Sequence, residues 1–275
     1  NTTMINSPPR DMEAWRSLVR AFVRHLLFRY GPSTVHKWPF TVWNEPDTPM
    51  SMFGFPQEDF FSFYCETWRQ LKELDPELSI GTPSVYYYRD GWRSWMRRFH
   101  DYCKAHHCLP EFVLMHFYGT VLYEDWKIYD HKDVTATRLR LTEDENMLAD
   151  SILDMHETVR SVYDGDLPVY LTEWNLSPSH RELLGDTCFR SCYLVKNILE
   201  NMDELESMGY WVLTDLFAEH QVPEKLFHGG LGLFTSNGIA KPAYYVLCLL
   251  NRLGDTLIGR GDGWFLTRQE NEYRL

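Results

Sequence analysis

With 275 residues, 44% of them hydrophobic and 24% charged, the sequence has the composition of a globular protein that can bury a full core. Its net charge of -12 argues against a nucleic-acid-binding surface, and it disfavours a polyanionic substrate unless a local cationic pocket outweighs the average. Every apolar run is shorter than a membrane-spanning segment, so we expect no contact with a membrane.

Apolar spacing along the chain predicts an alternation of helices and strands. The first helix covers residues 12–30, because apolar side chains recur on one face between a capping Asp11 and a terminating Gly31. Five strands are predicted after it, at residues 40–43, 78–81, 112–116, 169–173 and 209–214. The later helices are predicted at about residues 58–74, 91–106, 148–162, 186–202 and 244–253. This alternation indicates an α/β fold with a parallel sheet covered by helices, and the tail at 256–267 is predicted to open a β-hairpin.

The cysteines lie mostly inside predicted helices beside apolar neighbours, where a free thiol behaves as a small hydrophobic group. They are Cys65, Cys103, Cys108, Cys188, Cys192 and Cys248. No disulfide framework and no C-x-x-C pair is visible, so we predict a reducing, cytoplasmic location. Cys103 and Cys108 flank two histidines, but no second ligand pair follows nearby, and we predict neither a metal nor another cofactor.

Two glutamates come at the ends of predicted strands. Glu45 follows the strand at 40–43 within Trp-Asn-Glu-Pro, and Glu173 ends the strand at 169–173 before Trp-Asn. The carboxyl ends of the strands form the active-site face of a (β/α) barrel, so we expect both side chains to project into one cleft. Glycoside hydrolysis needs such a pair, one carboxyl to protonate the leaving oxygen and one to attack the anomeric carbon or activate water. For either glutamate alone, an ordinary surface carboxylate is the alternative.

The sequence around these glutamates resembles glycoside hydrolase family 39, the β-xylosidase and α-L-iduronidase family, in the clan of (β/α)8 retaining glycosidases. The similarity is carried by FRYG, WNEPD, LDPELSIGTPS, FVLMHFYG, VYLTEWNLS, GYWVLTDLF and LFHGGLGLFTSNGIAKPAYY, which together cover most of residues 10–254. The resemblance implies a partial TIM (β/α)8-type barrel, strands 4 to 8, over residues 1–254. It also implies that residues 255–275 begin a β-sandwich accessory region.

The same resemblance assigns roles to individual residues. Glu45 would be the general acid/base and Glu173 the nucleophile, while Asn44 would hydrogen-bond the sugar 2-hydroxyl. The other expected substrate-binding residues are His116, Tyr118, Tyr210, Trp211, Phe217, Phe227 and His228. For His116 and Trp211, ordinary packing in the core is the alternative. An aromatic content of 15% suits a carbohydrate cleft and a large aromatic core equally well.

The implied substrate is a xyloside or xylo-oligosaccharide, from which a terminal β-xylosyl residue is removed by double displacement. Residues 175–180 offer little positive charge for the carboxylate of a uronic acid, which favours a neutral pentoside. Barrels of this family also occur fused to helix-turn-helix regulators of the arabinose-responsive type. A non-catalytic or weakly active sugar-sensing barrel is therefore the alternative function, and a neighbouring glycosidase family with another sugar is a third.

Strands 1 to 3 of the family's barrel have no counterpart in this sequence, so strands 4 and 8 would be open edges. We expect the chain to be a piece of a larger protein. A homo-oligomer that covers the two edges and a remnant with a binding role are the alternatives. For the same reason the isolated chain is predicted to show weak glycosidase activity or none.

Overall fold

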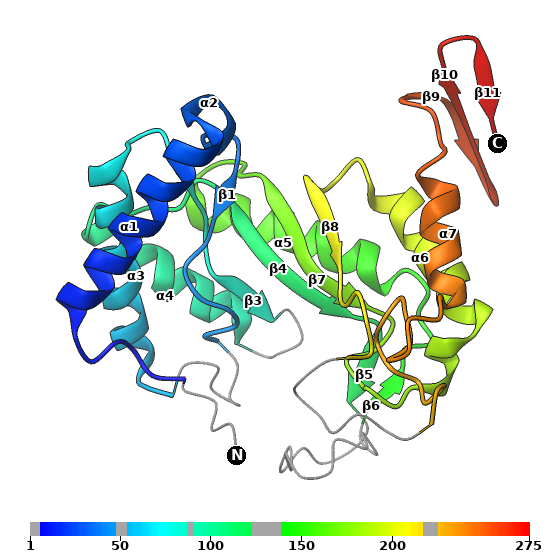
Figure 1. Cartoon of the computed structure of the whole chain (residues 1–275), viewed down its shortest axis with the longest axis horizontal. Coiled ribbons are helices and arrows are strands. Elements are labelled where there is room, and N and C mark those ends of the chain that lie inside the picture. Colours follow the sequence, from blue (N-terminus) through cyan, green and yellow to red (C-terminus); the bar gives the residue numbers. More distant parts are fainter. Residues whose placement is uncertain (1–5, 48–53, 87–90, 123–138, 217–224) are drawn as a thin grey trace. The chain divides into compact units, whose positions relative to one another are not determined.

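The computed structural model describes residues 6–47, 54–86, 91–122, 139–216 and 225–275 (Figure 1). Its helices are α1 (Met12–Tyr30), α2 (Pro32–Val35), α3 (Gln57–Leu74), α4 (Trp92–Ala105), α5 (Met147–Tyr163), the short η1 (Leu183–Asp186), α6 (Cys188–Asn201) and α7 (Pro242–Leu250). Its strands are β1 (Pro39–Phe40), β2 (Ser79–Ile80), β3 (Ser84–Tyr86), β4 (Val113–Tyr118), β5 (Thr120–Leu122), β6 (Leu139–Leu141), β7 (Val169–Asn175), β8 (Ser207–Tyr210), β9 (Thr256–Gly261), β10 (Trp264–Gln269) and β11 (Glu272–Arg274). Strands and helices alternate through most of the chain, which confirms the predicted α/β class.

The main sheet has the strand order β3-β4-β7-β8, and β3 runs parallel to β4. Strands β1 and β2 form a separate parallel pair, whereas β5 and β6 pair antiparallel. The predicted hairpin near the C-terminus is confirmed by the antiparallel pairing of β9 with β10, and β11 adds a third strand to it. Strand β3 was not predicted, because Thr82 and Pro83 before it suggest a turn.

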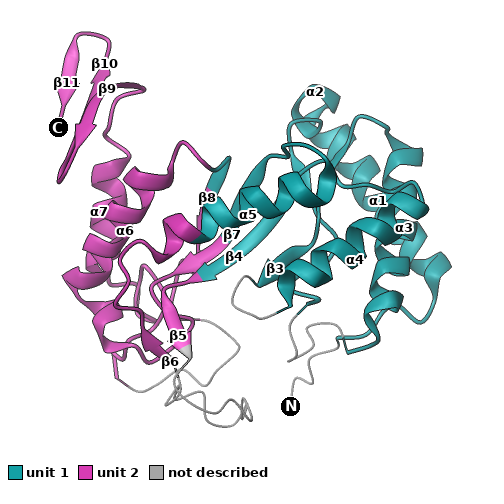
Figure 2. Cartoon of the chain, turned by 180° about the vertical axis from the view of Figure 1, so that it is seen from behind, with its two compact units in different colours: residues 1–117, 151–172, 205–207 teal, residues 118–150, 173–204, 208–275 magenta. Residues whose placement is uncertain are grey.

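The chain falls into two compact units, which have separate colours in Figure 2. Unit 1 comprises residues 1–117, 151–172 and 205–207, and unit 2 comprises residues 118–150, 173–204 and 208–275. The division passes through β4 after Phe117 and through β7 after Thr172. Each unit therefore holds one of the two glutamates. The predicted boundary at residue 254 stays a prediction.

The core of unit 1 is built where α1 and α3 meet β2. Helix α1 has the predicted bounds, since Asp11 Oδ1 accepts hydrogen bonds from the first-turn amides and Gly31 ends the helix at φ 79°. Its buried face packs in a cluster with neighbouring residues: Val19, Val23, Leu26, Val35, Leu71, Leu78 and Ile80. Each large aliphatic side chain buried in this way contributes about 1.5–3 kcal/mol, so the cluster fixes α1 on the rest of unit 1.

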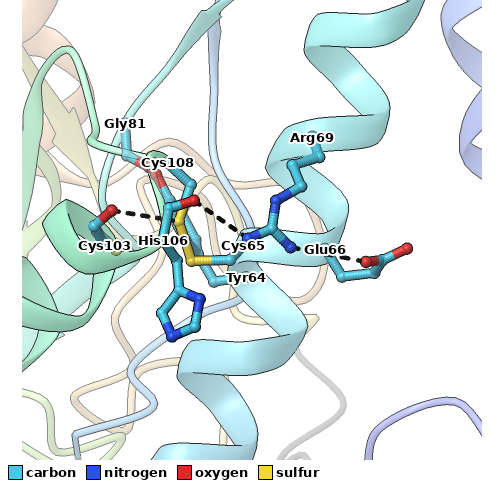
Figure 3. Close-up of a disulfide and its surroundings, with 8 residues drawn as sticks. All are labelled: Tyr64, Cys65, Glu66, Arg69, Gly81, Cys103, His106 and Cys108. Atoms are coloured by element: carbon cyan, nitrogen blue, oxygen red, sulfur yellow. Dashed lines mark hydrogen bonds and ion pairs between the residues drawn. A yellow bond between two sulfur atoms is a disulfide. The ribbon is translucent and has the colours of Figure 1, made fainter.

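A disulfide joins α3 to the segment that follows α4 within unit 1 (Figure 3). It links Cys65 and Cys108, whose Cα atoms are 5.5 Å apart, so the expectation of no disulfide was wrong for this pair. The two residues are 43 positions apart, and only the packing of α3 against α4 brings them together. Burial raises the pKa of the neighbouring Cys103 thiol. The cytoplasmic location remains a prediction.

Two polar contacts beside the disulfide tie the same elements together. Arg69 of α3 donates from Nη2 to the carbonyl oxygen of His106 at 3.1 Å, and Cys108 N donates to Cys103 O at 2.9 Å (Figure 3). The segment after α4 is therefore held to α3 by the disulfide and by the Arg69 hydrogen bond, and to α4 by the bond from Cys108 N. Among the described residues, no helix combines the length and the apolar character that crossing a membrane requires.

Candidate active site

The backbone around Glu45 is irregular. The strand predicted at 40–43 ends at Phe40, and the chain enters the left-handed region at Trp43 (φ 75°) and again at Glu45 (φ 44°). A residue with a side chain adopts such a conformation at a cost of about 1–3 kcal/mol, and the surroundings must hold it there. The Trp43 ring packs edge-on against Phe63 of α3, with centroids 5.9 Å apart. Strained residues of this kind are frequent at functional sites, so the segment 43–45 is a candidate for one.

Strand β3 holds the strained segment in place. Ser84 forms a parallel bridge with Asn44, and its hydroxyl donates to Asn44 Oδ1 at 2.9 Å. Glu45 N donates to Ser84 O at 3.1 Å. Further along, Tyr86 N donates to the carboxylate of Asp47, at 3.1 and 3.3 Å from its two oxygens. Residues 44–47 are thus bonded to β3 through both backbone and side chains, and these bonds fix the position of the Glu45 backbone.

The Glu45 carboxyl lies beside an imidazole in the interior of unit 1. Its Oε1 is 2.6 Å from Nδ1 of His116 on β4, and the two residues are 7% and 2% exposed. This contact exists in both protonation states of the glutamate. A protonated imidazole nitrogen donates to the carboxylate, and a protonated carboxyl donates to a bare Nδ1. When Nδ1 carries its proton, it can donate to Oε1 whether or not the other carboxyl oxygen is protonated, so Glu45 can release a proton without losing the hydrogen bond.

In unit 2, Glu173 lies near the end of the regular strand β7, where it accepts a hydrogen bond from the hydroxyl of Tyr118. The end of β7 is fixed by its neighbours. Trp211 N donates to Trp174 O at 3.0 Å, and the buried Asn175 side chain donates to Trp211 O. The position of Glu173 is thus fixed by the geometry of β7 and by the bonds that Trp174 and Asn175 make after it.

The chain matches the family model for glycosyl hydrolases family 39 over residues 3–262. It belongs to this family. The family 39 chain is 32% identical to a β-xylosidase of Geobacillus stearothermophilus, over 96% of the chain and 51% of that protein. It also superposes on the crystal structure of a monomeric β-xylosidase from Caulobacter crescentus with a TM-score of 0.81 and 29% identity, covering 96% of the chain and 51% of that structure. The chain thus spans about half the length of these relatives.

A more distant relative has a different description. An uncharacterized HTH-type transcriptional regulator of Staphylococcus aureus is 23% identical over 149 residues, which are 54% of the chain and 19% of that protein. Sequence similarity therefore extends to relatives described as enzymes and to a relative described as a regulator. The choice between the two roles has to come from the chemistry of the site.

Of the aromatic residues predicted to face the sugar, Tyr210 has its hydroxyl engaged by the protein. It ends β8, donates to Leu231 O at 2.9 Å and accepts from Arg190 Nη1 at 3.2 Å. Burial raises the pKa of the Tyr210 phenol. The predicted strand at 209–214 ends at this residue, and the peptide bond between Trp211 and Val212 is cis. A contact of Trp211 with sugar stays a prediction.

The loop residues that were predicted to close over the sugar differ in exposure. Phe227 is 49% exposed, whereas His228 is buried and its Nδ1 lies 3.1 Å from Lys225 O. Phe217 lies outside the described residues. The roles of Phe227 and His228 in sugar binding remain predictions.

Sequence reasoning missed a group of buried charges in unit 2. Arg190 of α6 and Lys241, which caps α7, are both fully buried, and each reaches the carbonyl oxygen of Gly230 at 3.0 Å. Asp186 and Asp215 are the anionic partners of Lys241. The available signal was a basic residue in a stretch that is otherwise apolar or small, such as Lys241 before Pro242. That signal gives no hint of the partners, which come from distant segments.

Proposed function

We propose that this chain is the catalytic region of a retaining exo-β-xylosidase, with Glu45 as general acid/base and Glu173 as nucleophile. The main support is that each glutamate bonds a side chain of β4, Glu45 through His116 and Glu173 through Tyr118. His116 and Tyr118 are two positions apart on this strand, and side chains with that spacing point to the same face. One strand therefore supplies a hydrogen-bonding partner for both carboxyls.

In the first step, an oxygen of Glu173 attacks the anomeric carbon while Glu45 gives its proton to the leaving oxygen. The glycosidic bond breaks, the leaving group departs as an alcohol, and a covalent glycosyl ester forms on Glu173. Tyr118 orients the attacking carboxylate through its hydroxyl. If Nδ1 of His116 carries its proton throughout, it donates to Oε1 of Glu45 before and after this step, and the proton that is transferred comes from the other carboxyl oxygen.

In the second step, the Glu45 carboxylate removes a proton from water, and the water oxygen attacks the anomeric carbon. The ester bond to Glu173 breaks, so the sugar leaves with its original anomeric configuration and both glutamates return to their starting states. Asn44 is held by Ser84 through Oδ1 and is proposed to bond the sugar 2-hydroxyl through its amide group. Such a bond strengthens as the transition state is approached.

The proposed substrate is a terminal β-xylosyl residue of a xyloside or xylo-oligosaccharide. Sequence identity to a β-xylosidase over nearly the whole chain supports a neutral pentose. We also propose that β1 to β4, β7 and β8 belong to strands 4 to 8 of a TIM (β/α)8-type barrel, as the superposition on a β-xylosidase suggests. An association that covers the edges of such a partial barrel, with a second copy or with further chain, is part of this proposal.

The test is covalent labelling with 2,4-dinitrophenyl 2-deoxy-2-fluoro-β-xyloside, followed by peptide mapping by mass spectrometry. It is applied to the chain in the association that covers its barrel edges, because the isolated chain is predicted to be weakly active or inactive. We expect one label per chain, on Glu173, because the fluorine slows the second step and lets the ester accumulate. The variant Glu173→Gln should take no label, and the surface variant Glu200→Gln should label like the wild type. A label on any other residue would remove the nucleophile assignment.

The second candidate function is a sugar-sensing barrel, favoured by the similarity to an HTH-type regulator. A sensor binds a sugar but needs no covalent intermediate. Calorimetric binding of xylose, together with an absence of label and of xylose release from an aryl xyloside, would favour the sensor. Accumulation of the fluoroxylosyl ester would exclude a purely non-catalytic role.

A further inference from the structure

Four charged side chains are buried together in unit 2 and form a neutral cluster. Lys241 Nζ lies 2.6 Å from Asp186 Oδ1 and 2.7 Å from Asp215 Oδ2, and the Lys241 and Asp215 side chains have no exposed area. Arg190, also fully buried, supplies the second positive charge. Buried ion pairs contribute little to stability in general, because desolvation offsets their attraction. We therefore expect the cluster to act through the backbone that it binds.

The cluster holds the backbone of residues 229–232, which we call the 229–232 turn. Its bonds to the turn are Gly229 N to Asp186 Oδ2 (2.5 Å), Gly232 N to Asp215 Oδ1 (2.8 Å), and Lys241 Nζ and Arg190 Nη1 to Gly230 O (both 3.0 Å). Both carboxylates thus accept from turn amides, and both cations donate to a turn carbonyl. Lys241 bonds the turn directly and also touches both carboxylates, so it connects all of these contacts.

A second set of donors meets on the carbonyl oxygen of Leu231. Arg190 Nη1 lies 3.2 Å from it, Tyr210 Oη 2.9 Å and Asn175 Nδ2 3.2 Å. Asn175 is two residues from the proposed nucleophile Glu173 on β7. The 229–232 turn is therefore bonded both to the buried charges and to the end of the strand that carries Glu173.

The three glycines of the turn lie too close to neighbouring atoms to carry a side chain. A Cβ at Gly229 would lie 2.4 Å from the Glu182 backbone, at Gly230 2.3 Å from Asp215 Oδ1, and at Gly232 2.4 Å from Asp215 N. Gly229 also has φ 81°, a conformation that favours glycine. The Gly-Gly-Leu-Gly sequence is thus explained by a backbone that lies directly against the carboxylates and their neighbours.

We infer that Lys241 is a positioning residue, which sets the 229–232 turn and, through it, the adjoining Phe227 and His228 for sugar binding. The inference rests on the proposed function, because the role of Phe227 and His228 as subsite residues belongs to that proposal. Lys241 itself is buried and does not touch the sugar. Its loss is expected to weaken substrate binding more than it slows the chemical steps on Glu45 and Glu173.

The test separates positioning from stability. Lys241→Met alone leaves an excess negative charge buried, which by itself destabilises the fold. The double variant Lys241→Met with Asp215→Asn keeps the cluster neutral, and its new amide oxygen can still accept from Gly232 N. It lacks the bond from Nζ to Gly230 O. The control is Lys104→Met, the same change at a surface lysine of unit 1 that is 62% exposed.

For the double variant we expect KM for an aryl β-xyloside to rise about tenfold with kcat within about threefold, the loss of roughly one hydrogen bond's worth of substrate binding. Amide hydrogen exchange at residues 227–232 should become faster, while exchange in β7 is unchanged. A wild-type KM together with wild-type exchange in the turn would overturn the inference. So would a kcat that falls as much as kcat/KM.

A measurement on the unmodified chain completes the test. In the wild type, the amides of Gly229 and Gly232 should exchange as slowly as buried strand amides, because carboxylates inside the protein accept from them. Exchange at the rate of an open loop would contradict the inference even if no variant folds. A chain that hydrolyses no xyloside even in the association that covers its barrel edges would end the proposed function, yet this measurement needs no substrate and still decides whether the turn is held.

Discussion

The two glutamates are carried by differently built backbone. Glu45 lies in an irregular segment of unit 1 at φ 44°, and its position depends on bonds to Ser84 and β3. Glu173 lies near the end of a seven-residue strand in unit 2, where the alternation of the strand decides its direction. One carboxyl is thus placed by strained backbone that its surroundings hold, and the other by regular secondary structure. We expect the two residues to answer differently to the same substitution.

The largest effect is expected for Glu173→Ala. Without the nucleophile no ester can form, and kcat for an aryl β-xyloside should fall by roughly 10⁵-fold, as for other enzymes that lose the nucleophile. Azide should then restore turnover by attacking the anomeric carbon directly, and the product should be the α-xylosyl azide. Nuclear magnetic resonance of the product checks the configuration. A β-xylosyl azide from this variant would contradict the assignment.

The matched substitution Glu45→Ala should give the opposite product and a graded loss. Proton transfer contributes about 10²–10⁴-fold, so an alkyl xyloside should be affected by about that much. A dinitrophenyl xyloside needs no protonation, so its glycosylation step should change little, and azide should yield the β-xylosyl azide. Rates across a series of leaving groups measure this. Equal losses for good and poor leaving groups would show that Glu45 is not the acid.

These expectations follow from residues that could be selected from the sequence, because motifs report chemistry at strand ends. Glu45 and Glu173 were chosen in this way, and the resemblance to family 39 added His116 and Tyr118. The contacts between them were not predictable, since the two hydrogen bonds join residues 71 and 55 positions apart. Sequence patterns therefore indicate which groups meet a substrate, whereas the partner of each group depends on tertiary packing.

Helices were predicted more accurately than strands for a local reason. Asp11 and Gly31 fix both ends of α1 with capping contacts that are close in sequence. The strand before Glu45 was predicted three residues too long, because nothing local shows that its pairing with β2 ends at Phe40. Lys241 was missed for the same reason as the disulfide. Each depends on partners from elements that are distant in sequence.

The two units also differ in how distant segments are tied, by a disulfide in unit 1 and by buried ion pairs in unit 2. The Cys65–Cys108 bond closes a loop of 43 positions, which in the chain-entropy model stabilises by about 4 kcal/mol. A reducing agent should therefore accelerate amide exchange in α3 and α4 by a corresponding amount and leave α6 unchanged. Hydrogen exchange measured with and without dithiothreitol checks this.

The control for the disulfide is Cys248→Ala, which removes an exposed thiol of unit 2. In this variant, amide exchange in α3, α4 and α6 should respond to dithiothreitol as it does in the wild type. The double variant Cys65→Ala with Cys108→Ala should reproduce the effect of the reductant and should no longer respond to it. If titration of the unreduced, unfolded chain finds six free thiols, or if reduction leaves exchange in α3 unchanged, the covalent tie is absent in solution.

The smallest expected effect is a pH dependence of stability that comes from an ion pair in unit 1. A hydrogen bond from His36 holds the pKa of Asp75 in unit 1 below its ordinary value, with Nε2 and Oδ2 2.8 Å apart. The folded chain therefore favours the carboxylate form of Asp75. The stability that results is fully present above the pKa of Asp75 in the unfolded chain, about 3.9, and is lost as the pH falls through its lower pKa in the folded chain. Because the side chains are 30% and 15% exposed, we expect less than about 1 kcal/mol. Asp75→Asn should flatten the decline of the Tm of the chain between about pH 5 and pH 3, whereas the exposed Glu73→Gln should not. Equal slopes in Asp75→Asn and wild type would show that the pair contributes nothing.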